Sequence, residues 1–143
     1  MNRKLVVAWI VAFVVWMGGS FVVHGVLLHD DYARLPNLFR SEAESQRFMP
    51  FMLLAHIIMS GAFAWIYSFG VERAPWVGQG LRFGIAGALL TAVPTYLIYY
   101  VVQPMPPATV AKQVIFSSIV VIVVGFVIAA LYRPAPVTRA AAT

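Results

Sequence analysis

Four long stretches of this chain contain no Asp, Glu, Lys or Arg, and this feature limits the possible folds more than any other. They cover residues 5–28, 49–70, 83–102 and 114–132. Each approaches or exceeds the roughly 20 apolar residues that an α-helix needs to cross about 30 Å of hydrocarbon. Only 10% of the 143 residues are charged, whereas an ordinary soluble domain has about 25%. The pattern predicts an integral membrane protein.

Helix is the expected conformation of all four stretches, because a helix satisfies its backbone hydrogen bonds within one segment, whereas an open sheet edge in lipid does not. We therefore expect an all-α integral membrane protein, a four-transmembrane-helix antiparallel bundle. Residues 1–132 form its single domain, with helices at about 5–28, 49–70, 81–102 and 110–132. Residues 133–143, rich in Pro and Ala, are expected to be a disordered cytoplasmic tail.

The basic residues predict an orientation. The N-terminal end, the second loop and the tail together carry six Lys and Arg residues, and the first and third loops carry four. The positive-inside rule then places both termini in the cytoplasm and loops one and three outside. Topology also accounts for the formal charge of +5, so nucleic acid is not an expected partner.

The first loop, residues 29–48, contains a helix start signal. Ser41 and Glu44 form an S-x-x-E capping box, which makes Ser41 the N-cap of a helix that leads into the second stretch. Pro50 follows within the early part of that helix, so a break or a kink there is equally expected.

Polar side chains gather toward the outer leaflet. On the second helix, His56, Ser60 and Tyr67 share one face by their spacing, and polar groups in a membrane usually face the bundle interior. Alternation of helix direction brings polar residues of the other helices to a similar depth. The candidate ligand pocket is His24, His56, Ser20, Ser60, Tyr67, Tyr96, Tyr99 and Gln113.

His24 and His56 have three competing interpretations. Two histidines on neighbouring helices could ligate a metal or the iron of haem b. Alternatively, each imidazole forms a hydrogen bond with a serine or tyrosine across a helix interface, or the pair belongs to a ligand or proton pathway. Hydrogen bonding is the favoured interpretation, and no cofactor is expected. The chain has no cysteine, which excludes thiolate ligands and nucleophiles.

Small residues form a stripe on the third helix, at Gly80, Gly84, Ala88, Thr91 and Thr95. Such a face lets another backbone approach closely, either within the bundle or between protomers. Catalysis is not expected, because no helix centre carries Asp, Glu or Lys and no serine or threonine has a base and an orienting acid at matching depth.

The whole chain resembles small four-helix bacterial inner-membrane proteins of families to which no activity is assigned. The resemblance lies in size, helix layout and loop pattern, from His24-Gly25 through Tyr32 to Tyr99-Tyr100 and Pro104-Met105-Pro106. It implies a multi-pass protein of the bacterial inner (cytoplasmic) membrane and does not imply an activity.

Three functions follow as hypotheses. The leading one is a non-enzymatic accessory or interaction subunit in the lipid bilayer, whose small-residue face packs against a second copy or another membrane protein. The second is a small-molecule binder or transporter that uses the outer polar pocket. The third is a haem- or metal-containing redox component that uses His24 and His56.

Overall fold

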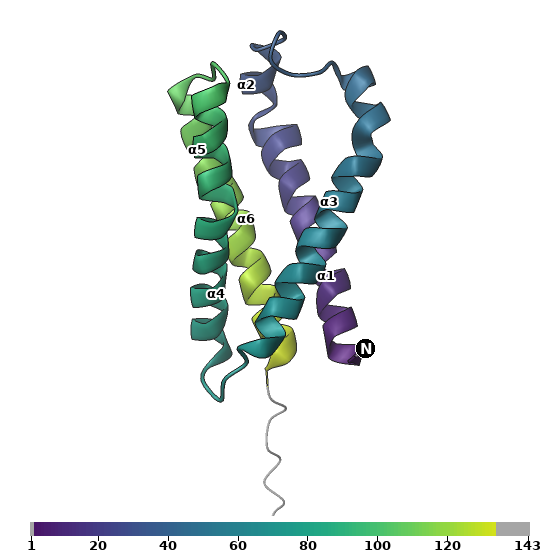
Figure 1. Cartoon of the computed structure of the whole chain (residues 1–143), viewed down its shortest axis with the longest axis vertical. Helices are drawn as coiled ribbons and strands as arrows, with labels where there is room; N and C mark the ends of the chain where they lie inside the picture. Colours follow the sequence, from purple (N-terminus) through teal and green to yellow (C-terminus); the bar gives the residue numbers. More distant parts are fainter. Residues whose placement is uncertain (1, 134–143) are drawn as a thin grey trace, which may run out of the picture.

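The computed structural model describes residues 2–133, and these contain helices and no strand. In chain order the elements are α1 (Arg3–Ser20), the π-helix η1 (Phe21–Leu27), α2 (His29–Ala33), α3 (Glu42–Phe69), α4 (Trp76–Leu90), α5 (Ala92–Val102) and α6 (Pro107–Tyr132) (Figure 1). The predicted disordered tail falls almost entirely on residues 134–143, outside the described residues.

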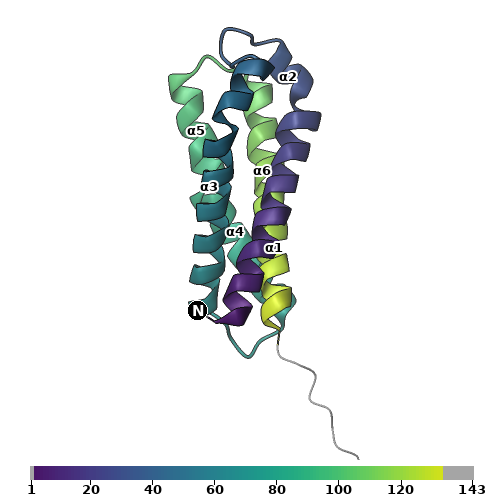
Figure 2. The same ribbon diagram turned by 90° about the vertical axis from the view of Figure 1, so that its right-hand side faces the viewer.

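Four helical spans are long and apolar enough to cross a membrane. They are Arg3–Leu27, Glu42–Phe69, Trp76–Val102 and Pro107–Tyr132, with 25, 28, 27 and 26 residues. Figures 1 and 2 show them running roughly side by side, with α2 at the end of the bundle opposite the N-terminus. We call these the α2 end and the N-terminal end.

The helices begin earlier than the uncharged stretches suggested, and for α3 a cap explains the difference. α3 begins at Glu42 because the Ser41 hydroxyl accepts a hydrogen bond from the Glu44 N–H at 3.3 Å, which confirms the predicted N-cap. Pro50 lies inside this helix without ending it. α6 begins at Pro107, in the first helical turn, where a proline without an N–H does no harm.

The third span is divided at Thr91. There α4 ends and α5 begins, three residues before Pro94, which cannot donate a hydrogen bond to the preceding turn. The Thr91 hydroxyl donates to the Gly87 carbonyl oxygen at 2.7 Å.

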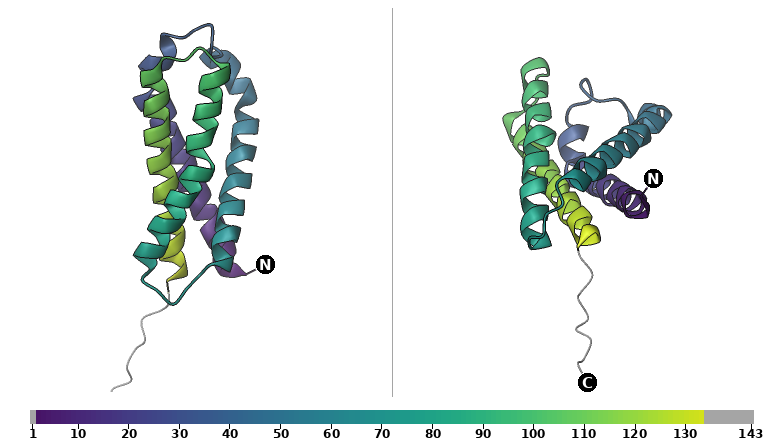
Figure 3. Two further views of the ribbon diagram at one scale, coloured as in Figure 1. Left: turned by 60° about the vertical axis from the view of Figure 1, so that its left-hand side comes forward. Right: turned by 60° about the horizontal axis from the view of Figure 1, so that its bottom comes forward.

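Helix α6 is the central element of the packing. It contacts α1, α4 and α5, whereas α3 packs mainly on α1. In Figures 1 and 3, α3 diverges from the other helices toward the α2 end. The buried apolar cluster, which includes Trp16, Phe63 and Val124, therefore lies in the half of the bundle near the N-terminal end. The Trp16 and Phe63 rings meet edge to face there at 5.2 Å.

Glycines bring the backbones of α4 and α6 together. A Cβ atom on Gly84 would lie 2.7 Å from Ile122 Cα, and one on Gly125 would lie 2.7 Å from Gly84 Cα. A Cβ atom on Gly80 would lie 3.0 Å from Phe126 Cα. The glycines of the predicted small-residue stripe thus face α6 of the same chain.

Candidate functional site

The imidazole of His24 is the centre of a hydrogen-bonded group at the α2 end. His24 lies in η1, a π-helical turn in which the Leu28 N–H donates to the Val23 carbonyl at 2.9 Å. Its Nδ1 lies 2.6 Å from the Tyr32 hydroxyl oxygen, and its Nε2 lies 3.0 Å from that of Tyr96. One side chain therefore connects η1 with α2 and α5.

Helix α6 completes this group through Gln113 and Ser117. The Gln113 amide donates to the Tyr32 oxygen at 3.1 Å, and the Ser117 hydroxyl donates to the Tyr96 oxygen at 3.1 Å. Because the Tyr32 oxygen already accepts from Gln113, the Tyr32 proton can go to Nδ1 of His24. An uncharged His24 then holds its proton on Nε2 and donates it to Tyr96. We call Tyr32, His24, Tyr96, Gln113 and Ser117 the His24 network.

An ion pair also holds α2 against α6. The Lys112 ammonium donates to both carboxylate oxygens of Asp31, at 2.8 and 3.1 Å. Burial raises the pKa of the neighbouring Tyr32 to about 12, and the hydrogen bond from Gln113 opposes that rise. Tyr32 therefore remains a neutral phenol at physiological pH.

His56 joins α3 to α1 by a second, separate set of hydrogen bonds. Its Nδ1 lies 2.8 Å from the Met52 carbonyl oxygen, and its Nε2 lies 3.0 Å from the Ser20 hydroxyl oxygen. A carbonyl oxygen only accepts, so Nδ1 must carry a proton. In the uncharged imidazole Nε2 is then an acceptor, and the Ser20 hydroxyl donates its single proton to it.

The divergence of α3 leaves a large cavity between α1, η1, α2 and α3. Its volume is about 980 Å³. Met17, Met49, Met52 and Met59 line its apolar part together with Trp16, Phe21 and Phe39. Its polar lining comes from Ser20, His24, Tyr32 and His56 and, near the loop, from His29, Arg40, Ser41, Glu42 and Ser45. We call this space the α1–α3 cavity.

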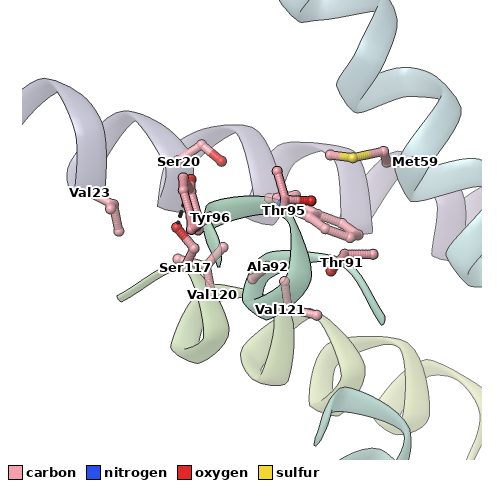
Figure 4. A pocket seen from close by; sticks show the side chains of 11 residues that line it. Ser20, Val23, Met59, Thr91, Ala92, Thr95, Tyr96, Ser117, Val120 and Val121 are labelled. Atoms are coloured by element: carbon pink, nitrogen blue, oxygen red, sulfur yellow. Dashed lines mark hydrogen bonds between the residues drawn. The ribbon is translucent and has the colours of Figure 1, made fainter. Parts of the chain in front are cut away.

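A smaller cavity of about 140 Å³ lies deeper, between α1, α3, α5 and α6 (Figure 4). Hydroxyl groups of Ser20, Thr91, Thr95, Tyr96 and Ser117 contribute to its walls. Three residues line both cavities: Trp16, Ser20 and Met59. Ser20 therefore lies at the boundary between the two spaces.

The residues expected in one pocket do not all lie together. Ser20, His24, His56, Tyr96 and Gln113 lie in the two hydrogen-bonded groups at or near the cavities. The Ser60 hydroxyl donates within its own helix, to the His56 carbonyl oxygen at 2.7 Å.

Two of the expected residues lie elsewhere. The Tyr67 ring packs against Phe83 and Tyr132 in the buried core, at 5.0 and 5.5 Å. Tyr99 is 45% exposed on α5. The position of Tyr67 follows from helix geometry, since Tyr67 is three turns beyond His56 along α3.

Sequence reasoning missed Tyr32 and the methionines as site residues. Tyr32 is in the loop, where a polar side chain carries little signal, although it follows His24 by only eight residues. The methionines look like ordinary lipid-facing residues until the angle of α3 is known.

A haem or metal ligand would have to replace existing contacts at both histidines. Each ring nitrogen of His24 and of His56 has a hydrogen-bond partner. Within residues 2–133, no three His, Cys, Asp or Glu side chains are grouped so that they could hold a metal ion. The arrangement fits the hydrogen-bonding interpretation of the histidines better than ligation.

Comparison of this chain with protein-family models, with curated proteins and with solved structures finds no match.

Proposed function

We propose that this chain is a membrane-embedded binding protein for a small amphipathic molecule, which occupies the α1–α3 cavity. The observation that carries the proposal is the cavity itself, with its volume of about 980 Å³. Typical ligand sites have about 300–1,000 Å³ and combine mainly apolar walls with a few placed polar groups.

The chemistry of the walls supports an amphipathic ligand. Methionine side chains adapt to differently shaped apolar groups, and four of them line this cavity. The polar groups are confined to the Ser20–His56 pair, the His24–Tyr32 pair and the loop residues at the α2 end. An apolar body with a limited number of hydrogen-bonding atoms matches this distribution.

The interaction-subunit hypothesis remains a second proposal. It was based on the small-residue stripe of the third span, and it now requires a different surface. Gly80 and Gly84 pack against α6 of the same chain, so this part of the stripe is not available to a second protomer. A partner or a second copy would have to use other exposed apolar side chains, which all four spans offer.

We also propose that the protein lies in the bacterial inner membrane with both termini in the cytoplasm. The N-terminal end, the second loop and the tail together carry six Lys and Arg residues against four in the first and third loops, which supports this orientation. It would place the α2 end, and the polar mouth of the cavity, on the outer side. Cysteine-accessibility labelling at Ser45 and at Gly78 tests it, and labelling of Gly78 from outside would overturn it.

The binding proposal can be tested by filling the cavity. Met52→Trp adds a ring inside it, whereas Ile58→Trp adds the same ring on the exposed side of the same helix. Native mass spectrometry of gently solubilised protein should find a copurified small molecule on the wild type and on Ile58→Trp, and lose it on Met52→Trp. Equal occupancy of the two variants would contradict the proposal.

A further inference from the structure

We infer that the α1–α3 cavity selects an uncharged ligand with a hydroxyl group, and that the ligand hydroxyl donates its proton to Ser20 Oγ. This inference rests on the proposed binding function and adds the chemical class of the ligand. It follows from the direction of the hydrogen bonds at His56 and from the distribution of charge along the cavity walls.

The direction of the hydrogen bonds leaves Ser20 as an acceptor. The Met52 carbonyl oxygen takes the Nδ1 proton of His56, and Nε2 takes the only hydroxyl proton of Ser20. The Ser20 oxygen keeps an unused lone pair, since a hydroxyl oxygen can accept two hydrogen bonds. Ser20 lines the cavity, so a ligand atom that reaches it must be a donor. An ether or ketone oxygen cannot meet that requirement.

The distribution of charge excludes an ionic donor at this depth. The charged residues in the cavity lining are Arg40 and Glu42, and both lie in the loop or at the first residue of α3. Glu42 and His56 are fourteen residues apart on α3, which is roughly 21 Å along the helix axis. An ammonium group at Ser20 would be a charge in the membrane without a counter-ion, at a cost of several kcal/mol. An alcohol donates without that cost.

The test uses four photoreactive probes that share one ten-carbon chain with a diazirine near its end. Their head groups are a primary alcohol, a methyl ether, a primary ammonium and a carboxylate. The full-length protein is labelled in lipid nanodiscs, and the labelled peptides are mapped by mass spectrometry. Labelling near Met17, Met52 and Met59 reports the cavity. Labelling at Leu90 and Val101, which are 75% and 85% exposed on α4 and α5, reports partition into lipid.

We expect the ratio of cavity labelling to lipid-face labelling to be about three- to tenfold higher for the alcohol than for the ether, as one hydrogen bond in a membrane implies. The ammonium and carboxylate probes should give ratios no higher than the ether. If the ether, ammonium or carboxylate probe matches the alcohol inside the cavity, the inference is wrong while the binding function stands. If no probe labels the cavity above the lipid face, the binding function itself fails.

A double variant locates the selectivity. Ser20→Ala with His56→Phe removes the acceptor oxygen and the imidazole that orients it, and should bring the alcohol-to-ether ratio in the cavity down to its value at the lipid face. Ser68→Ala with Ile58→Phe also removes one serine hydroxyl and adds one phenyl ring, but outside the cavity, and should keep the wild-type ratio. Retention of the preference in the first variant would overturn the assignment to Ser20.

Discussion

The hydroxyl oxygen of Tyr32 lies 2.6 Å from Nδ1 of His24, which fastens the short helix α2 to the π-helical turn of the first span. Tyr32 also accepts a hydrogen bond from Gln113 of α6. This one phenol thus connects η1 and α2 with α6, whose Gln113 is 81 residues further along the chain, and it forms part of the wall of the α1–α3 cavity.

Removal of the phenol should destabilise the α2 end. Tyr32→Phe leaves Nδ1 of His24 and the Gln113 amide without their partner, and we expect a loss of about 1–2 kcal/mol in the free energy of unfolding. Unfolding in mixed micelles with increasing SDS measures it. Tyr99→Phe removes a hydroxyl from a side chain that is 45% exposed and should change stability little. If Tyr32→Phe lowers the free energy of unfolding no more than Tyr99→Phe does, the Tyr32 hydrogen bonds do not contribute to stability.

Alkaline pH should weaken the fold through the same residue. The pKa of Tyr32 is about 12 in the folded chain, against an ordinary value of 10.0. Between these values the unfolded chain releases the Tyr32 proton first, so the free energy of unfolding falls as pH rises. Below pH 10 the effect is absent. Unfolding midpoints at pH 9 and 11 should therefore differ less for Tyr32→Phe than for the wild type, and an identical difference would refute the expectation.

Glycine substitutions on α4 should separate packing from helix propensity. Gly84→Ala places a Cβ atom 2.7 Å from the Ile122 backbone, so α4 and α6 must move apart, at a cost of about 1–3 kcal/mol. Gly78 is on the same helix, and a Cβ atom added there would meet nothing within 4 Å. Gly78→Ala should therefore be neutral or stabilising, because alanine favours helix. Thermal unfolding followed by circular dichroism compares the two. A stability order opposite to this one would mean that the α4–α6 contact is wrong.

The tautomer of His56 gives a spectroscopic prediction. The Met52 carbonyl oxygen requires a proton on Nδ1, so the neutral ring should be present as the Nδ1–H form, the less common tautomer in solution. Long-range ¹H–¹⁵N NMR spectra of histidine-labelled protein distinguish the two forms. The exposed His29 provides an internal reference. Detection of a proton on Nε2 alone would contradict both this assignment and the acceptor role given to Ser20.

The helical content could be predicted from sequence because charge-free length is sufficient to identify a span. Ser41 could be assigned as the N-cap for a similar reason, since a capping box is a local pattern. The angle between α1 and α3 could not be predicted. It depends on which side chains meet, such as Trp9, whose indole N–H donates to the Ile57 carbonyl oxygen at 2.8 Å.

The candidate site was predictable only in part for the same reason. The position of a residue along the bundle axis follows from counting residues from the helix end. This count put His24, Tyr96 and Gln113 at similar positions. Tyr67 lies against Phe83 and Tyr132, away from His56, because sharing a face of a helix does not mean sharing a depth. The π-helical turn that carries His24 had no recognisable signal in the Phe21–Leu27 sequence, and its extra residue per turn changes the direction of every side chain after it.

The contrast between two helix pairs has a mechanical consequence. The main chains of α4 and α6 are in contact at Gly84 and Gly125, so neither helix can shift along the other without a steric clash. α3 meets its neighbour α1 largely through side chains, including the Trp9 indole. If a ligand occupies the α1–α3 cavity as proposed, α3 is the span whose displacement can admit it, because α4 and α6 are held together by direct main-chain contact.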